Sequence, residues 1–228
     1  MSITDRMNVT QHNFRVQPPE GWEPADPRIA FFNGQAPTWD AKGPNPTATL
    51  ARLAPLRERL GLRAGLDLLE IGCGTGQITG WLAECVQPGR VVAADFAPAM
   101  LEQARARKLT AEFRLLDICC AQPVSEQFDL VLCFNALPHF RDKPQALRQL
   151  AAHLKPAAEL LVVHLSGSAQ LNSFHHSVGG PVGHDFLPSA DQWPDLLTAA
   201  GLQVAELTDQ ADLFLLKARH HGQGAKAE

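Results

Sequence analysis

Residues 66–76 read LDLLEIGCGTG, an apolar run that ends on an acid and then on glycines at alternate positions. This pattern is typical of a buried parallel strand that leaves its sheet, and residues 77–83 have the composition of a following helix. Glycines let the backbone pass close to a ligand, because they carry no Cβ. A dinucleotide site needs the spacing G-x-G-x-x-G, whereas this loop is G-x-G-x-G with Glu70 two residues ahead, so no diphosphate is required.

Strand and helix patterns alternate along the rest of the chain. The expected helices are 46–60, 77–85, 97–108 and 143–154, and the expected strands are 91–94, 113–116, 130–134 and 159–164. For the first of these helices, Thr47 or Thr49 is the predicted N-cap and Gly61 the stop. Such alternation predicts right-handed βαβ units, and therefore a parallel sheet.

The C-terminal part departs from this alternation. Two strand-like runs, 202–207 and 212–218, are separated by only a few polar residues, and a hairpin cannot be parallel. The sequence therefore predicts an α/β fold in which helices cover both faces of a mostly parallel sheet that contains one antiparallel strand.

Length and composition predict one globular domain. The chain has 228 residues, 45% of them apolar, which is enough for a full core. Four prolines among polar residues favour an extended arm over residues 1–28, followed by the domain at 29–219 and a short polar tail at 220–228. The net charge of −4, with dispersed Lys and Arg, gives no basic face and disfavours a nucleic-acid partner.

The cysteines and the N-terminal residues indicate a cytoplasmic protein. The first 19 residues lack the apolar core of a signal peptide, and no later run reaches the roughly 20 apolar residues of a membrane span. Five cysteines, an odd number, suit reduced thiols. The adjacent Cys119 and Cys120 either pack in the core or hold a soft metal, but no Cys-x-x-Cys or Cys–His spacing supports a metal site.

The glycine loop is followed in order by 90–96 (RVVAADF), 113–118 (FRLLDI) and 128–135 (FDLVLCFN). This series resembles the class I methyltransferases that use S-adenosylmethionine (SAM). The resemblance implies a Rossmann-like seven-stranded sheet, with SAM as the methyl donor and S-adenosylhomocysteine (SAH) as the product. Residues 29–40 (IAFFNGQAPTWD) resemble the segment that caps the cofactor in ubiquinone- and menaquinone-type methyltransferases.

Ligands of open α/β sheets bind beyond the carboxyl ends of the strands. Given the resemblance, the amides of the glycine loop are expected to meet the methionine moiety, while Glu70 holds the loop or contacts the amino group through water. Asp95 is expected to accept hydrogen bonds from both ribose hydroxyls or, alternatively, to cap the helix that begins near Ala97. Asp117 and Ile118 are expected to frame the adenine. The predicted cofactor-binding residues are Glu70, Gly72, Cys73, Gly74, Thr75, Gly76, Asp95, Phe96, Met100, Asp117, Ile118 and Asn135.

Methyl transfer from SAM is a direct displacement, so the protein has to align the acceptor and, for some acceptors, remove a proton. His139, which follows the fourth strand, is the predicted general base. The sequence before it, Asn135-Ala136-Leu137-Pro138, lacks the first proline of the Asp/Asn-Pro-Pro-aromatic signature of amino-methylating enzymes. Planar amines are therefore disfavoured as acceptors.

A second group of histidines follows the fifth strand. His164 ends that strand, and the segment 166–188 is rich in Gly, Ser and His, which predicts a substrate lid with a short helix near 171–177. Trp39, His164, His175 and His176 are the predicted acceptor-binding residues. The histidines could alternatively bind a metal, but no H-x-x-x-H or H-E-x-x-H spacing is present and none is predicted.

Three functions are compatible with these patterns. The favoured one is methylation of a small molecule on a thiol, a phenol or an acidic carbon. The alternatives are a quinone-precursor C-methyltransferase and a SAM-binding module without catalysis, the latter being favoured if side chains fill the acceptor pocket.

Overall fold

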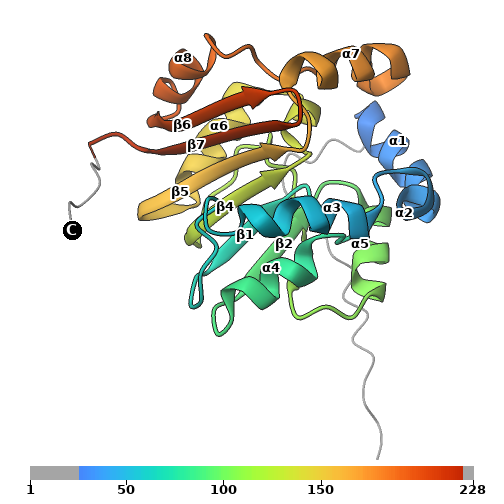
Figure 1. Ribbon diagram of the computed structural model, residues 1–228, viewed down its shortest axis with the longest axis horizontal. Coiled ribbons are helices and arrows are strands. Elements are labelled where there is room, and N and C mark those ends of the chain that lie inside the picture. Colours follow the sequence, from blue (N-terminus) through green and yellow to red (C-terminus); the bar gives the residue numbers. More distant parts are fainter. Residues whose placement is uncertain (1–25, 223–228) are drawn as a thin grey trace, which may run out of the picture.

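A computed structural model describes residues 26–222 of the chain, and these form a seven-stranded sheet with helices on both faces (Figure 1). The strands are β1 (Leu68–Ile71), β2 (Val91–Asp95), β3 (Glu112–Leu115), β4 (Phe128–Phe134), β5 (Leu154–His164), β6 (Leu202–Gln210) and β7 (Leu213–His220). The α-helices are α1 (Pro27–Gln35), α2 (Trp39–Lys42), α3 (Pro46–Leu53), α4 (Thr79–Val86), α5 (Pro98–Ala106), α6 (Lys143–Ala152), α7 (Ser168–Val178) and α8 (Trp193–Thr198). Short 3₁₀ helices are η1 (Ala36–Thr38), η2 (Ala54–Leu56), η3 (Leu137–His139) and η4 (Gly180–Val182).

The strand order β3-β2-β1-β4-β5-β7-β6 confirms the predicted fold class. The central strand β1 pairs in parallel with both β2 and β4, with Glu70 opposite Ala93 on one side and Leu132 on the other. β7 runs antiparallel to both of its neighbours, β5 and β6. The C-terminal hairpin therefore supplies the antiparallel strand that its short connection predicts.

Two apolar layers cover the sheet, one on each face. Successive strand residues alternate between them, because side chains of a strand point to opposite faces. On β1, Leu69 and Ile71 join the layer formed with α6 and α8, while Leu68 packs with α3 and α4 on the other face. This double burial explains why the parallel strands read as continuous apolar runs.

The strand order reverses between β1 and β4, whose crossovers carry α4 on one face and α6 on the other. A crevice opens at the carboxyl ends of such strands. Helices α1, α2 and α7 gather at one end of the sheet (Figure 1), and residues of all three helices line the cavities described below. The fold thus brings the N-terminal segment and the segment after β5 to one site.

The predicted helix 46–60 is shorter than expected. α3 ends at Leu53 and continues only as the 3₁₀ turn η2, because Pro55 has no backbone N–H and its ring disfavours a longer α-helix. The predicted N-caps Thr47 and Thr49 were also wrong, since the Asn45 side chain accepts the N–H of Ala48 at the start of α3. Asparagine is a strong N-cap, and Pro46 suits the first helical position.

The segment 166–188 is more regular than predicted. α7 has 11 residues and ends at Gly179, which adopts a φ of +67°. Its start is attached to the C-terminal hairpin, because Asp209 accepts hydrogen bonds from the Ser168 N–H (2.8 Å) and hydroxyl (2.5 Å). The spacing of Leu171, Phe174 and Val178 is a helical stripe that the abundance of Gly, Ser and His obscured.

The predicted arm 1–28 overlaps α1, which begins at Pro27. Asp26 caps this helix by accepting the N–H of Arg28 at 2.9 Å, so the proline marks a helix start here rather than an extended segment. The tail predicted from residue 220 also begins late, since β7 includes His220. The rest of the predicted arm and tail, 1–25 and 223–228, lies outside the described residues.

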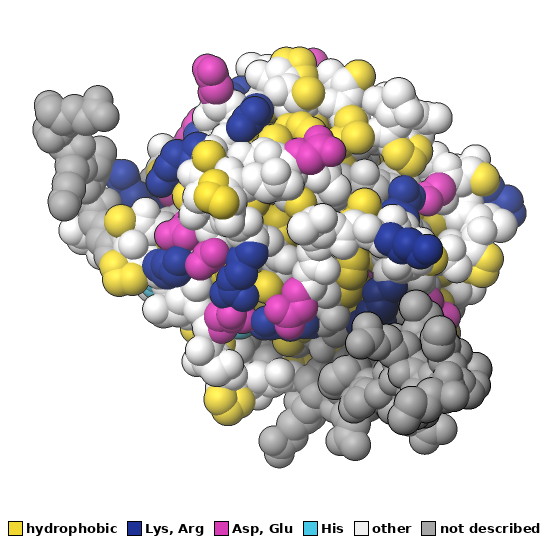
Figure 2. Space-filling model, turned by 90° about the horizontal axis from the view of Figure 1, so that it is seen from below, with side chains coloured by type: hydrophobic (Ala, Val, Ile, Leu, Met, Phe, Trp, Pro, Cys, Tyr) yellow, Lys and Arg dark blue, Asp and Glu magenta, His cyan; other side chains and the backbone are white. Residues whose placement is uncertain are grey.

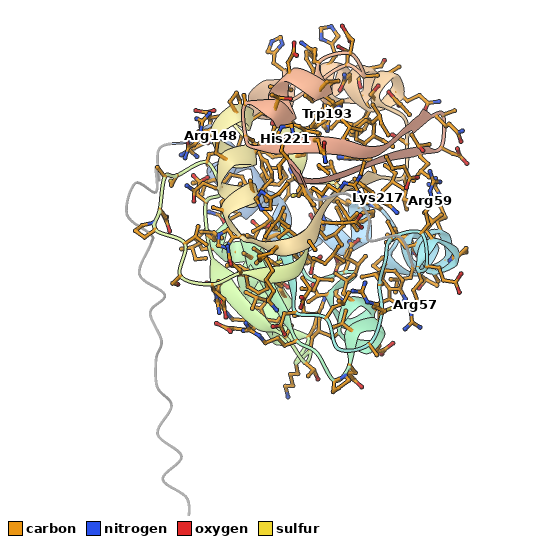
Figure 3. All side chains as sticks on the ribbon, turned by 90° about the vertical axis from the view of Figure 1, so that its left-hand side faces the viewer. Arg57, Arg59, Arg148, Trp193, Lys217 and His221 are labelled. Atoms are coloured by element: carbon orange, nitrogen blue, oxygen red, sulfur yellow. The ribbon has the colours of Figure 1, made fainter. Side chains whose placement is uncertain are left out.

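Charges of both signs are interspersed on the face seen in Figure 2. Arg59 and Lys217, both labelled in Figure 3, contact the same carboxylate of Glu206, at 2.8 Å and 3.1 Å. These residues are only partly exposed, and ion pairs near the protein surface contribute little to stability. No helix within residues 26–222 is long and apolar enough to span a membrane.

Trp193 provides a test of the core beneath α8. Its side chain is fully buried against Phe214, with ring centroids 5.9 Å apart, and its indole N–H has no hydrogen-bond partner among the described residues. We expect Trp193→Ala to lower the free energy of unfolding by about 3–5 kcal/mol, measured by urea denaturation. Trp193→Phe should cost less than half as much, because it keeps most of the ring and removes the unpaired donor. Equal losses in both variants would contradict this packing.

Candidate functional site

Two adjoining cavities lie at the carboxyl ends of the parallel strands. The inner cavity is lined by residues from the ends of β1 to β4, among them Asp95, Phe96, Met100, Asp117, Ile118 and Phe140. The outer cavity is lined by Glu70, Cys73, Thr75, Phe134, His164, Phe174 and His175, among others. Both cavities share the residues Trp39, Gly72, Gly74, Asn135 and His139. These shared residues form the boundary at which a ligand of one cavity meets a ligand of the other.

The glycine loop follows β1 and forms part of this boundary. Gly72 has a φ of +77°, and a Cβ there would lie 2.3 Å from the Cβ of Ala136, so only glycine fits between the loops that follow β1 and β4. Gly74 has a φ of +55°, and a Cβ there would meet no atom within 4 Å. The loop therefore presents bare backbone to open space. Gly76 lines neither cavity, and its missing Cβ allows close packing against Ala104 of α5.

Asp95 ends β2 and supports the glycine loop from below. Its two carboxylate oxygens accept the N–H groups of Gly74 at 2.8 Å and of Ala97 at 2.9 Å. Burial raises the pKa of this carboxyl to about 6 despite these hydrogen bonds. The N–H of Phe96 also contributes to the hydrogen bonding of this carboxylate, which lines the inner cavity. The carboxylate therefore holds the turn before α5 and lines the inner cavity, but α5 itself has Ala97 as its N-cap residue and no side-chain cap. The contact of Asp95 with the ribose stays a prediction.

Glu70 lies on β1 under the same loop. It accepts the hydroxyl of Thr79, the first residue of α4, at 2.7 Å. Burial, together with the nearby Asp95 carboxylate, raises the pKa of Glu70 to about 7. The contact with Thr79 corresponds to the predicted loop-holding role, and the same side chain also lines the outer cavity.

Asp117 lines the inner cavity, where an arginine engages its carboxylate, and its contact with the adenine stays a prediction. Its carboxylate accepts the N–H of Cys119 at 2.9 Å and forms an ion pair with Arg141, which also lines the inner cavity. Ile118 lines the cavity beside it. Sequence reasoning missed Arg141, because its partner lies 24 residues away and no motif joins the two.

Aromatic rings from the N-terminal helices cover the boundary between the cavities. The Phe32 ring lies 5.9 Å from Trp39, 5.7 Å from Phe96 and 5.0 Å from His139, measured between centroids. Asp40 of α2 accepts the Thr75 hydroxyl at 2.7 Å, and Arg107 donates to the same carboxylate. The segment 29–40 is thereby attached to the glycine loop. Trp39 lines both cavities, and its contact with the acceptor stays a prediction.

His139 is held by a buried carboxylate from the predicted lid. Its Nδ1 lies 2.9 Å from Oδ2 of Asp185, a residue with only 1% of its surface exposed. Arg28 of α1 donates to the same carboxylate from Nε (3.0 Å) and Nη2 (2.5 Å). Burial alone would raise the pKa of Asp185, but the hydrogen bonds from His139 and Arg28 lower it below its usual value. Arg28 was missed, since it lies 157 residues from its partner.

The other predicted histidines fall into two groups. His164 and His175 are buried, both line the outer cavity, and the His175 ring lies 4.9 Å from that of His139. His176 is exposed on α7 and lines neither cavity, because consecutive helical residues point in different directions; its contact with the acceptor stays a prediction. No metal-binding cluster of three His, Cys, Asp or Glu occurs in the part of the chain that the structure describes.

The known proteins to which the chain is similar are methyltransferases. A family model for a methyltransferase domain matches residues 68–157. A trans-aconitate 2-methyltransferase from Deinococcus radiodurans is 34% identical over 143 residues, covering 57% of this chain and 54% of the relative. A ubiquinone biosynthesis O-methyltransferase from Xanthomonas euvesicatoria is also 34% identical, over 138 residues and 56% of each chain.

Over part of its length, the chain is therefore similar to the class I SAM-dependent methyltransferases. Solved structures share its methyltransferase fold: a SAM-dependent methyltransferase from Clostridium acetobutylicum has a TM-score of 0.61 at 14% identity, covering 84% of this chain and all of that one. A DhpI–SAH complex has a TM-score of 0.64 at 22% identity, covering 86% and 96%. The chain spans just over half the length of the two curated relatives named above. The family resemblance inferred from the glycine loop is confirmed.

The buried acid under the glycine loop of this methyltransferase fold gives a pH test. Between pH 4.5 and 7 the folded protein keeps a proton on Glu70 that the unfolded chain releases, so this residue makes the wild type lose stability as pH rises. The variant Glu70→Gln has no titratable carboxyl group at this position and keeps a side-chain oxygen that accepts the Thr79 hydroxyl. We expect the variant to gain about 2–3 kcal/mol relative to wild type between pH 5 and pH 8, measured by chemical denaturation without cofactor. A pH-independent difference would contradict the assignment.

Proposed function

We propose that the chain catalyses transfer of a methyl group from SAM to a small-molecule acceptor, with His139 as the general base. The observation that carries this proposal is the position of His139 on the boundary of both cavities, with Nδ1 bound to a buried carboxylate. Such a residue contacts both reactants when the donor occupies the inner side of the boundary and the acceptor the outer side.

The residues of the inner cavity fit an adenosine. Asp95 brings a carboxylate to this cavity that can accept a hydrogen bond from a ribose hydroxyl, and Met100, Ile118 and Phe96 supply apolar surface for a purine. The open backbone at Gly74 leads from this cavity to the outer one, where Glu70 and Thr75 suit the polar methionine end. When bound, SAM supplies the activated methyl group on its sulfonium, so the chain's own task is alignment and proton removal.

The Asp185 carboxylate determines which nitrogen of His139 acts as the base. An ionised carboxylate accepts a hydrogen bond, so Nδ1 carries the proton and Nε2 keeps its lone pair. The acceptor's proton moves to Nε2 as its oxygen, sulfur or carbon takes the methyl group, and Asp185 stabilises the resulting imidazolium. Lys143 Nζ donates to the carbonyls of Pro138 (2.9 Å) and Phe140 (3.3 Å) and so holds the turn that carries the base.

The outer cavity argues for catalysis rather than SAM binding alone, because side chains do not fill it. The relative from Xanthomonas euvesicatoria is named an O-methyltransferase, which favours oxygen among the acceptor atoms. A quinone-precursor C-methyltransferase would use the same base and is distinguished by a product methylated on ring carbon. The five cysteines are free thiols in buried positions, which supports placing this activity in the cytoplasm.

Asp95→Ala tests the donor site. Loss of a buried acceptor costs about 1–3 kcal/mol, so we expect SAM affinity measured by calorimetry to fall about 10- to 100-fold. Asp195→Ala, on the exposed side of α8, is the matched control and should bind SAM as wild type does. Undiminished affinity in Asp95→Ala, or a wild-type protein that does not bind SAM, would refute the donor site.

His139→Ala tests the base. We expect turnover to fall roughly 10²- to 10⁴-fold, with SAM affinity almost unchanged, in an assay of SAH formation with thiols, phenols and quinols. Asp185→Asn should also lower turnover, because an amide no longer selects the Nδ1–H form. His176→Ala is the exposed control. Full turnover in His139→Ala, together with an unaltered pH profile, would exclude His139 from the mechanism.

A further inference from the structure

His164 is a buried polar residue without a partner. It ends β5 with 2% of its surface exposed, and neither ring nitrogen has a hydrogen-bond partner among the described residues. The side chain lines the outer cavity. Buried polar groups in proteins are almost always hydrogen-bonded, and an unpaired one is costly. A partner supplied by a ligand of this cavity would remove that cost.

The surroundings keep His164 neutral. Burial, with smaller effects from His139 and His175, lowers the pKa of His164 to about 3. A neutral imidazole offers one N–H donor and one acceptor nitrogen. The charged groups that face the outer cavity besides these histidines are Lys42, Arg52 and Glu70. None of them forms a hydrogen bond with His164.

Apolar rings make up much of the remaining wall. Phe31, Trp39 and Phe134 line the outer cavity, and Phe174 of α7 lies on it with 60% of its surface exposed. Phe174 and Val178 are the large hydrophobic side chains that remain exposed in residues 26–222. Such a wall suits a flat apolar body with few polar atoms.

We propose that His164 binds a second, uncharged hydroxyl of the acceptor, whose first hydroxyl is methylated at His139. The inference rests on the proposed function and adds the acceptor class, an aromatic ring with two hydroxyl groups. A hydroxyl both donates and accepts, so it can pair with either nitrogen of a neutral imidazole. A carboxylate would accept from only one nitrogen, and burying its charge beside a neutral imidazole would be costly. In this reaction His164 is a specificity-determining residue, while His139 moves the proton.

Binding of catechol, resorcinol and phenol to the SAH-loaded protein tests this assignment by calorimetry, with ¹⁵N imidazole NMR to observe His164. We expect catechol or resorcinol to bind at least 10-fold more tightly than phenol and to shift the His164 resonances. His164→Leu should abolish this preference, whereas His164→Asn, which keeps a donor and an acceptor, should retain part of it. His176→Leu is the exposed control and should bind as wild type does.

Equal binding of the monohydric and dihydric phenols would overturn the proposal. So would failure of both dihydric probes to bind, tighter binding of benzoate, or a preference that survives His164→Leu. Thermal denaturation and SAH affinity of each variant show whether the fold and the donor site persist. The preference is read from binding, with and without SAH, and not from turnover. Its failure is therefore distinct from a failure of the proposed function, which would show as absent SAM binding or as turnover that does not depend on His139.

Discussion

The reversal of strand order between β1 and β4 is the constraint on which the site depends. Because α4 and α6 lie on opposite faces, the loops after these two strands diverge and leave a crevice between them. The same loops also touch, since Gly72 approaches Ala136 more closely than any Cβ would allow. This contact places bare backbone beside the turn that carries His139. A larger residue at position 72 would separate the two halves of the site.

Electrostatics distinguish the acids under the glycine loop from the histidines of the outer cavity. Burial raises the pKa of Asp95 and Glu70 beneath the glycine loop, and it lowers the pKa of His164 and His175 in the outer cavity. A cationic donor is favoured near the acids, whereas a neutral acceptor suits the uncharged imidazoles. Asp185 is the exception, because its ion pair with Arg28 keeps it ionised and able to orient the base.

Long-range contacts join three parts of the chain around this base. Arg28 comes from α1, Asp185 follows α7, and His139 lies in η3 after β4. Asp209 of the C-terminal hairpin also holds the start of α7. The outer cavity is therefore closed in part by segments that belong to neither β1 nor β4.

Local pattern in the sequence determined the parallel strands, the glycine loop, the acid after β2 and the antiparallel hairpin, because strand burial, φ > 0 and short connections leave direct signals in neighbouring residues. The same signals placed His139 and Asp95 at the carboxyl edge. Only the tertiary structure decided that Asp185 and Arg28 hold His139, that Arg141 engages Asp117, and that His164 faces the cavity while His176 faces solvent. Such pairings join residues up to 157 positions apart, and their energy comes from burial and geometry that no local window of sequence contains.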